Sequence, residues 1–258
     1  AVPRTGWAPR FVTVHRGAQL VAAAPAYLKS HSYGEYVFDW AWADAYQRHG
    51  LRYYPKLLVA VPFTPVPGSR LLAVDDAARH TLLAGLAQVA EDEDASSVHL
   101  LFHEPDETPV IAAQGWLARQ GVQFHWTQDA AVPHADFSAF LASLQREKRK
   151  KIQQERRRVA EAGVTFTVHE ADQIDGDLWR FFHQCYVGTY RAHGSTPYLT
   201  AAFFQAMAAT QPQHWLMFVA RLGGQPVGAS LVAIDRARGQ AYGRYWGATT
   251  YIPCLHFE

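Results

Sequence analysis

The chain has 258 residues, of which 49% are hydrophobic and 13% aromatic, so it can build two small domains with sizeable cores. Charged residues make up 18% and the net charge is +1, which excludes a disordered chain and a global field that recruits polyanions. Cys185 and Cys254 are too few for a disulfide framework or a cysteine metal site, and we expect no metal. No apolar run approaches the ~18 residues of a membrane span. We therefore expect no integral membrane segment and a cytoplasmic location.

The same hairpin pattern occurs twice. Residues 12–26 read VTVHRGAQLVAAAPA and residues 218–232 read FVARLGGQPVGASLV, which align at an offset of 206. Each copy is an apolar strand, a turn with glycine and a second apolar strand rich in small residues. Glycine supplies the positive φ that a tight hairpin turn needs. The alignment joins Gly17 to Gly223, Gln19 to Gln225, Val21 to Val227 and Ala23 to Ala229. If the flanking elements also correspond, the echo marks a duplicated domain.

Apolar periodicity predicts the elements of the first half. Asp75 or Asp76 can cap a helix that presents Leu82, Leu83 and Leu86 on one face. A shorter helix ends where Gly121 can provide a C-cap. After the hairpin, the predicted order is a strand at 56–63, a helix to about 90, a strand at 97–103, a helix at 108–120 and a strand at 122–128.

The second half begins with a long helix that Asp136 or Ser138 can cap and that Gly163 ends. The remaining predicted elements are a strand at 164–170, helices at 176–190 and 200–209, strands at 214–220, 226–234 and 240–247, and a helix that starts at Pro253. Superposed, the two halves give strand, two helices, a three-strand meander, helix, strand, helix, strand.

That element order is the plan of the GNAT N-acyltransferase fold, an α/β fold with mixed sheets. On this plan the first copy lacks its opening elements and the second its closing elements, so we expect a fragment in which both GNAT-like domains are incomplete. The predicted boundaries are a first domain at 1–135, a basic connecting helix at 136–163 and a second domain at 164–258.

Several blocks of sequence are long and unusual in composition. They are KSHSYGEYVFDWAWADAY (29–46), RYYPKLLVAVPFTPVPGSRLL (52–72), REKRKKIQQERRRV (146–159), HGSTPYLT (193–200) and RYWGATTYIPCLHFE (244–258). Together they resemble a bacterial family of N-acyltransferases catalogued as peptidoglycan biosynthesis or recognition proteins, which is similar to the FemAB aminoacyl-transferases with tandem GNAT folds. The resemblance implies transfer of an aminoacyl group from aminoacyl-tRNA to an amine of a peptidoglycan precursor. Ordinary GNAT enzymes use acyl-CoA instead.

The residues give some information about the donor. A CoA-dependent GNAT enzyme grips pyrophosphate with a loop of the form [QR]xxGx[GA] ahead of a helix, where backbone N–H groups point at the phosphates. The first copy has TPVPGSR (64–70) there, and its prolines contribute no N–H. The second copy has ATTYIP (248–253), and the formal match RARGQA (236–241) lies in a hairpin turn. The sequence thus favours a donor other than CoA, with acyl-CoA and aminoacyl-tRNA both retained as candidates.

The helix predicted at 136–162 is strongly basic. Residues 146–158 carry eight Lys or Arg and two Glu, a local charge of +6 in a chain of +1. It could be a solvated linker helix, or it could bind phosphates of tRNA or of a pyrophosphate-linked precursor. Lys148, Arg149 and Lys151 are the candidate phosphate contacts.

Acyl transfer to an amine requires a base for the amine, a donor to the carbonyl oxygen and a cradle for the tetrahedral intermediate. Two polar blocks supply candidates. We expect His193 or Glu35 as the base, with Tyr198 as a proton relay and His31 as a further catalytic candidate. The candidate substrate-binding residues are Ser32, Tyr33, Asp39, Trp40, His103, Glu104, Ser195, Thr196, Tyr245, Trp246, His256 and Glu258.

Three functions remain open at this point. The chain could be a FemAB-like acyl- or aminoacyl-transferase acting on a small-molecule or peptidoglycan-precursor amine. It could be a conventional acetyl-CoA-dependent N-acetyltransferase. It could also be a noncatalytic module that binds cell-wall precursor or RNA on a GNAT scaffold, and bound CoA or salt-dependent tRNA binding without turnover would separate these cases.

Overall fold

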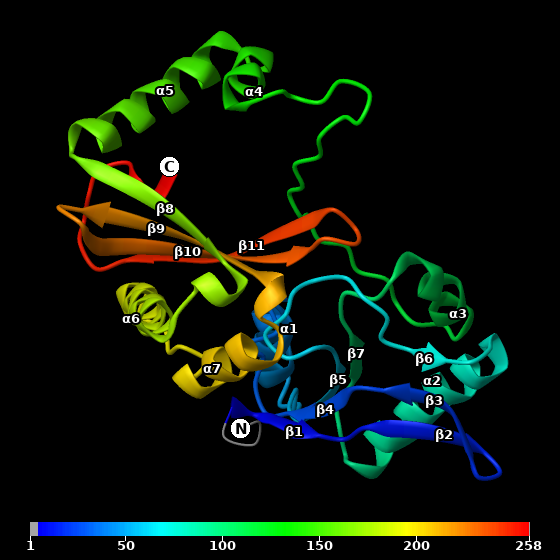
Figure 1. The fold of residues 1–258 in the computed structure, drawn as a ribbon. Helices are drawn as coiled ribbons and strands as arrows, with labels where there is room; N and C mark the ends of the chain where they lie inside the picture. The colour runs from blue at the N-terminus through cyan, green and yellow to red at the C-terminus, as the bar shows by residue number, and fades with distance from the viewer. Residues whose placement is uncertain (1–4, 258) are drawn as a thin grey trace. The chain divides into compact units, whose positions relative to one another are not determined.

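A computed structural model describes residues 5–257 and divides the chain into two compact units. Unit 1 comprises residues 1–123 and unit 2 residues 124–258. Both contain helices and β-sheet, so the fold is mixed α/β with several sheets (Figure 1). The boundary expected from the sequence, after residue 135, lies further along the chain.

Unit 1 contains two small sheets. One has the strand order β1-β4-β5-β7 and the other β2-β3-β6. Strands β5 and β7 pair in parallel, and helix α2 connects them as a crossover. The strands are β1 (Trp7–Pro9), β2 (Val12–Arg16), β3 (Gln19–Ala24), β4 (Ala26–Lys29), β5 (Lys56–Val59), β6 (Leu72–Ala73) and β7 (Val98–Leu100). The helices are α1 (Trp40–Arg48), α2 (Asp76–Asp92) and α3 (Thr108–Ala113), preceded by a 3-10 turn at Pro105–Glu107.

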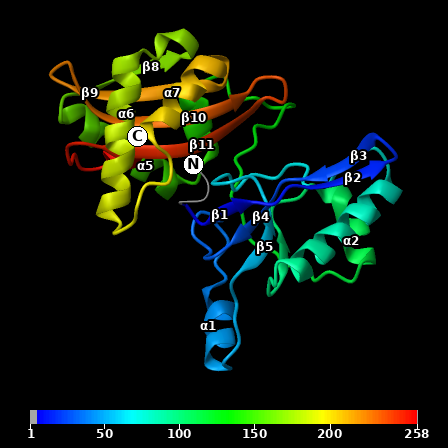
Figure 2. The same ribbon diagram turned by 90° about the horizontal axis from the view of Figure 1, so that it is seen from below.

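Helix α2 covers the hairpin β2–β3, as Figure 2 shows. Its N-cap Asp75 accepts a hydrogen bond from the Ala78 N–H at 2.7 Å, which satisfies one of the free amides of the first turn. The predicted apolar stripe is buried, with Leu82, Leu83 and Leu86 at most 1% exposed. The core of unit 1 therefore lies between α2 and the strands.

Unit 2 is built on one antiparallel sheet of order β11-β10-β9-β8. Helices α6 and α7 lie on one face of this sheet and α5 on the other (Figure 1). The elements are α4 (Phe137–Ser143), α5 (Arg146–Glu161), β8 (Val164–Glu170), α6 (Gly176–Ala192), α7 (Ala201–Thr210), β9 (Trp215–Leu222), β10 (Gln225–Asp235) and β11 (Gln240–Ala248), with 3-10 turns at Ala171–Gln173, Pro212–His214 and Leu255–Phe257.

Helix α6 packs closely on β11 at one glycine. A Cβ on Gly247 would lie 2.5 Å from the Cys185 carbonyl oxygen and 2.6 Å from Thr189 Oγ1. The Thr189 hydroxyl donates to the Trp246 carbonyl at 3.0 Å. The absence of a side chain at Gly247 thus lets the helix backbone approach the strand. Burial in this core raises the pKa of the Cys185 thiol to about 12, so this cysteine is inert.

The two hairpins recognised in the sequence have the same register. In β2–β3, Val14 pairs with Ala22 and Val12 with Ala24. At the offset of 206, the equivalent pairs in β9–β10 are Ala220 with Gly228 and Phe218 with Ser230. Both ladders also shift at the same place, where Val21 in one and Val227 in the other have no opposite residue. The sequence echo therefore corresponds to a repeated hairpin, including its bulge.

The repeat extends to the third strand of the meander. Strands β3 and β4 together correspond to β10, interrupted at Pro25, and β5 corresponds to β11. Ala26 pairs with Val59 as Val232 pairs with Gly243, and Lys29 pairs with Lys56 as Asp235 pairs with Gln240. The connections differ: residues 236–239 make a tight turn in unit 2, whereas residues 30–55 join the same two strand ends in unit 1. We call residues 30–55 the inserted connection.

Some predicted elements are wrong. Residues 122–128 form no strand, and Phe124 is 93% exposed. The helix predicted at 108–120 ends at Ala113, and Leu117 is exposed. The helix predicted at 136–162 is broken, because Leu144 and Gln145 have extended ψ values of 154° and 145°. At the end of the described chain, the helix predicted from Pro253 is a 3-10 turn.

Candidate functional site

The inserted connection encloses a cluster of buried charges. Lys29 and Lys56 stand opposite each other at the ends of β4 and β5, and both are fully buried. The inserted connection contributes Ser32, Glu35 and Asp39, each at most 3% exposed. Two cations and two carboxylates are thus removed from water at one end of the meander. Burying charges is costly unless they are paired, so the pairing decides whether this arrangement holds.

Lys56 is the centre of the cluster. Its Nζ lies 2.8 Å from Glu35 Oε2 and 2.8 Å from Ser32 Oγ, and it also donates to Asp39 Oδ2. All three protons of the ammonium group therefore have acceptors. Tyr53 donates its hydroxyl hydrogen to Asp39 Oδ2 at 2.7 Å, and Ser32 Oγ is 2.8 Å from the Tyr54 hydroxyl. These contacts hold the inserted connection against β5.

Lys29 is less completely paired. Its Nζ donates to the Tyr33 carbonyl at 3.1 Å and lies 3.9 Å from Glu35 Oε1. The same Nζ stands 4.0 Å from the centre of the Trp7 ring, a cation–π contact. Glu35 Oε1 and Asp39 Oδ1 are buried without a hydrogen-bond partner. The cluster therefore retains unused acceptor capacity.

Burial and pairing shift the pKa values in different directions. Burial, only partly offset by Glu35, lowers the pKa of Lys29 to about 8. Burial also raises the pKa of Glu35, against the opposing attraction of Lys56. For Asp39, burial is the largest single influence and opposes ionisation, but hydrogen bonds from Lys56, Ser32 and Tyr53 outweigh it and lower the pKa. Asp39 is therefore the firmly ionised partner of Lys56.

Three aromatic side chains form a continuous surface array beside the cluster. The His31 and Tyr33 ring centres are 5.2 Å apart, and those of Tyr33 and Trp40 are 5.1 Å apart. Tyr33 is 56% and Trp40 42% exposed, while His31 is half-buried. We call His31, Tyr33 and Trp40 the aromatic array. Gly34 fixes the backbone between them, since its φ is +81° and a Cβ there would lie 2.5 Å from the Phe63 ring.

The protonation of His31 follows from its hydrogen bond. The Tyr33 N–H donates to His31 Nδ1 at 3.2 Å, so neutral His31 carries its proton on Nε2. Burial, followed by the charge of Lys29, lowers its pKa and favours this neutral form. In this tautomer His31 is a hydrogen-bond donor at Nε2. Nε2 lies against Gly6, where a Cβ would come within 2.3 Å of it, so the imidazole is poorly placed to abstract a proton.

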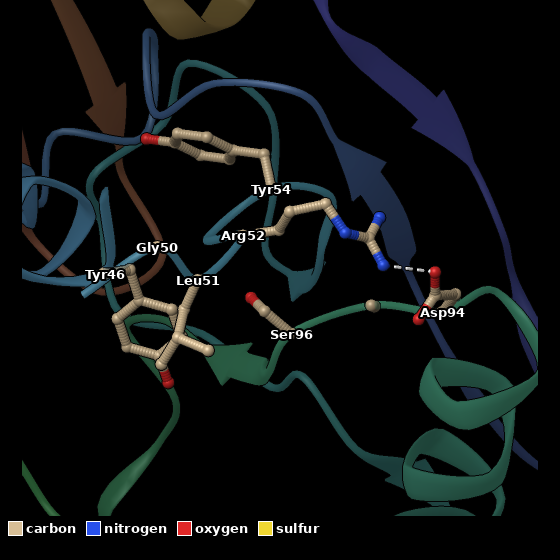
Figure 3. A pocket seen from close by; sticks show the side chains of 8 residues that line it. Tyr46, Gly50, Leu51, Arg52, Tyr54, Asp94 and Ser96 are labelled. Atoms are coloured by element: carbon tan, nitrogen blue, oxygen red, sulfur yellow. Dashed lines mark hydrogen bonds and ion pairs between the residues drawn. The ribbon is translucent and has the colours of Figure 1, made fainter. Parts of the chain in front are cut away.

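A pocket of about 380 Å³ lies on another side of the same region (Figure 3). Its walls include Tyr46, Leu51, Tyr54 and Ser96, and Arg52 forms an ion pair with Asp94 at its rim. Figure 3 shows the Tyr54 hydroxyl directed away from Arg52 and Ser96. Because that hydroxyl contacts Ser32, Tyr54 joins the pocket wall to the buried cluster.

The loop at 64–70, where a CoA enzyme would grip phosphate, is closed by the protein itself. The Glu107 carboxylate is 1% exposed and accepts the N–H groups of Arg70 and Leu71, at 2.9 and 2.7 Å. It also accepts the Ser69 hydroxyl at 3.0 Å. The Arg70 guanidinium donates to the carbonyls of Leu101, Gly68 and Val66. An internal carboxylate thus occupies the amides that an anionic ligand would need.

Of the candidates near this loop, His103 and Glu104 are half-buried. His103 Nδ1 lies 2.9 Å from the Glu104 carbonyl, and the Glu104 N–H donates to Glu107 at 3.2 Å. Both residues support the turn around Glu107 rather than the cluster at Lys56.

The unit 2 candidates lie in three places. His193, Ser195 and Thr196 are exposed in the turn after α6, while the Tyr198 ring packs on Tyr190 at 5.7 Å. Tyr245 packs in the core against Tyr186, and Trp246 contacts the ring of His256 at 4.7 Å. Glu258 lies outside the described residues. The structure therefore brings Tyr245 together with the α6 aromatic residues. It does not join His193 to an acidic partner among the described residues 5–257.

The basic helix is α5. Lys148 and Lys151 are exposed, and Arg149 is half-buried with a 3.3 Å hydrogen bond to the Ala142 carbonyl. Lys151 is 3.8 Å from Glu155. A groove of about 360 Å³ runs between α5 and β8 and is lined by Arg156, Arg157 and Phe166 among others. Lys148 and Lys151 therefore present their charges to solvent.

Sequence reasoning missed several residues of the buried cluster. Lys29, Lys56, Tyr53 and Trp7 were not among the candidates, although two of them carried a signal. Lys29 ends the apolar strand AYLK and Lys56 begins the apolar run KLLVA. A lysine that continues a buried strand pattern indicates a paired interior charge. Within residues 5–257, no group of His, Cys, Asp and Glu is arranged to hold a metal ion, and no helix is long and apolar enough to cross a bilayer.

No curated protein shows significant similarity to the chain. A crystal structure of FemX is similar over 96% of this chain and 73% of its own, with 13% identity and a TM-score of 0.48. The C-terminal domain of a candidate lysylphosphatidylglycerol synthetase from Agrobacterium fabrum is similar over 98% of this chain, with 13% identity and a TM-score of 0.51. The chain spans 64% of that domain's length, and the likeness concerns the fold.

The sequence profile of the FemAB-like family, described as peptidoglycan biosynthesis/recognition, matches residues 1–258. The match covers the inserted connection, the basic helix and both meanders. The chain therefore belongs to the FemAB-like family of peptidoglycan biosynthesis/recognition proteins.

Proposed function

We propose that this protein transfers an acyl or aminoacyl group to an amine of a peptidoglycan precursor, on two GNAT-like units. The observation that carries the proposal is the repeated meander. Its hairpins β2–β3 and β9–β10 have the same pairing register and the same bulge. In unit 1 a helical crossover and a parallel strand follow the meander, in the order of the N-acyltransferase plan. Membership of the FemAB-like family supports the peptidoglycan precursor as the acceptor.

The proposed step is an aminolysis. The neutral acceptor amine attacks the carbonyl carbon of the donor, a C–N bond forms and the ester or thioester bond breaks. The amine loses a proton to a base and the leaving group gains one, so the exchange balances without a redox partner. In unit 1, Glu35 and Asp39 are positioning residues because they are buried. In unit 2, His193 is the separate candidate for the base, with Tyr198 as its proton relay.

The structure supports a donor other than CoA in unit 1. Glu107 occupies the amides of Arg70 and Leu71, so a pyrophosphate at this turn would displace a buried carboxylate. The exposed cations of α5 support aminoacyl-tRNA, whose phosphates they could bind. Acyl-CoA remains the second candidate, through unit 2.

The test is a transfer assay with the chain as it stands. The protein is incubated with a sugar-linked peptidoglycan stem peptide and either aminoacyl-tRNA or acyl-CoA, and the acceptor is analysed by mass spectrometry. We expect a new amide, seen as an added aminoacyl or acyl mass on an amine-containing fragment. An acceptor whose amine is acetylated beforehand is the control and should gain nothing.

The outcome with each donor separates the candidate functions. Product with aminoacyl-tRNA alone supports the FemAB-like reaction, and product with acyl-CoA alone supports a CoA-dependent acetyltransferase. Binding of the precursor without product from either donor would contradict the proposal and indicate a noncatalytic recognition module.

A further inference from the structure

The aromatic array has features of a ligand site that the reaction scheme does not use. Tyrosine and tryptophan side chains usually bury a large area when a protein folds. Tyr33 and Trp40 instead lie side by side and are 56% and 42% exposed. Large exposed aromatic surface beside polar groups marks interaction sites in monomeric proteins. The rings are also in mutual contact, through centres 5.2 and 5.1 Å apart, so they present one surface.

The buried cluster holds this surface in place. Lys29 Nζ binds the carbonyl of Tyr33 itself, and the Tyr33 N–H is bound by His31. Asp39, which precedes Trp40 and starts α1, is fixed by Lys56 and Tyr53. Both exposed rings thus adjoin backbone that a buried charge anchors. Unit 2 joins the equivalent strand ends with residues 236–239 alone, so the cluster and the array are an addition to unit 1.

The charges around the array indicate the class of ligand. Among residues 29–56, Lys29 and Lys56 are buried, Arg48 is paired with Asp44 at 2.9 Å, and Arg52 is paired with Asp94. Arg119 lies over Trp42, 5.6 Å from the ring centre, on a different face of α1 from Trp40, because residues two apart in a helix do not share a face. A nucleic acid needs unpaired Lys or Arg at its phosphates. A neutral sugar ring needs only aromatic faces for its C–H groups and a few hydrogen-bonding groups. The imidazole of His31 adds a third ring to this surface, with Nδ1 bound to the Tyr33 N–H and Nε2 against Gly6.

We propose that the aromatic array of His31, Tyr33 and Trp40 is a binding site for a neutral pyranose ring, such as an N-acetylated amino sugar of a glycan acceptor. This proposal specifies which part of the acceptor is bound. It rests on the proposed function only for the identity of the acceptor. The buried cluster of Lys29, Glu35, Lys56 and Asp39 acts as its rigid support.

The test measures sugar binding separately from transfer. N-acetylglucosamine and its trimer are titrated into the full chain and followed by saturation-transfer NMR and calorimetry. The Trp40→Ala and Tyr33→Ala variants should bind about tenfold more weakly or worse, because each removes one stacking face. Trp40→Phe should retain most of the affinity. Phe38→Ala is the matched control, since Phe38 is 80% exposed in the same connection but outside the array.

The possible results are distinct. Equal sugar binding by wild type, Trp40→Ala and Tyr33→Ala would overturn the proposal, as would no binding of either sugar by wild type. Array-dependent binding of a single-stranded oligonucleotide in place of the sugar would overturn it in favour of nucleic acid. Array-dependent sugar binding without any acyl transfer would leave this site standing while the proposed reaction fails. Unchanged circular dichroism of the variants establishes that they are folded.

Discussion

At the scale of single residues, the chain's most unusual feature is its cluster of four buried charged side chains. None of them could be buried stably without an oppositely charged partner. Lys29 and Lys56 continue an apolar strand pattern, and their burial is tolerated because Glu35 and Asp39 accompany them. Buried ion pairs contribute little net stability but are strongly destabilising when one partner is removed. The cluster is therefore better explained by positioning of the inserted connection than by stability.

Lys56→Met should be severely destabilising, because it leaves Glu35 and Asp39 buried without their shared cation. We expect a loss of about 3–5 kcal/mol in the free energy of unfolding, measured by urea denaturation. The double variant Lys56→Met/Asp39→Asn keeps Lys29 and Glu35 as a balanced pair and should recover much of that loss. A single variant within about 1 kcal/mol of wild type would show that the cluster is not electrostatically coupled.

Lys29 makes stability depend on pH in a defined direction. Its pKa is about 8 in the folded protein against 10.5 ordinarily, so between these values the unfolded chain binds the proton more tightly. Stability therefore increases as pH rises through this window, since the folded state no longer holds a buried charge. The stability difference between wild type and Lys29→Met should shift in favour of wild type from about pH 7 to about pH 10. A difference independent of pH would mean that Lys29 is not desolvated in the folded protein.

At the scale of elements, the sequence predicted the helices and strands that carry a clear local pattern. It missed those whose formation depends on packing against other parts of the chain. Strand β8 has the predicted bounds of 164–170, and α2 has the predicted cap and stripe. Both carry strong local signals. Strand β1 has three residues and ends at Pro9, and β4 has four residues and follows Pro25, so both are too short to show a period. Helix α1 was not predicted, because Trp40 and Trp42 suggest a buried segment although both side chains are exposed.

The predicted strand at 122–128 failed for a different reason. Val122, Phe124 and Trp126 alternate with polar residues as a half-buried strand would, yet they are 85%, 93% and 65% exposed. A strand forms only where a neighbour accepts its backbone hydrogen bonds, and the alternation carries no information on that. Similarly, the charge pattern of 136–162 suggested one helix but could not show the break at Leu144.

Helix α5 leads to a prediction about polyanion binding. Replacing Lys148, Arg149 and Lys151 with Ala should weaken tRNA binding and flatten its dependence on salt, by roughly 0.7–0.9 units of log–log slope for each phosphate that is no longer neutralised. The matched control removes three exposed arginines that are paired with carboxylates, Arg180, Arg236 and Arg238. Both triple variants change the net charge equally. Equal slopes in the two variants would mean that α5 is a solvated helix without a specific role.

At the scale of the whole molecule, the chain repeats one meander and modifies it in one copy. The repeat could be predicted from the sequence, because its glycines and small residues are visible at a fixed offset. The modification could be located only partly. His31, Ser32, Glu35 and Asp39 were recognised as a polar block, but their burial, and their pairing with lysines on two strands, depend on the register of β4 and β5. No local pattern encodes that register.

The central claim is that the inserted connection recognises the acceptor. Hydrogen–deuterium exchange with and without a disaccharide-linked stem peptide tests it in the unmodified protein, because bound ligand slows exchange where it orders the backbone. The account predicts slower exchange in residues 30–42, with the equivalent turn at 236–239 unchanged. Protection confined to 236–239 or to other parts of unit 2, with residues 30–42 exchanging as in the free protein, would contradict it.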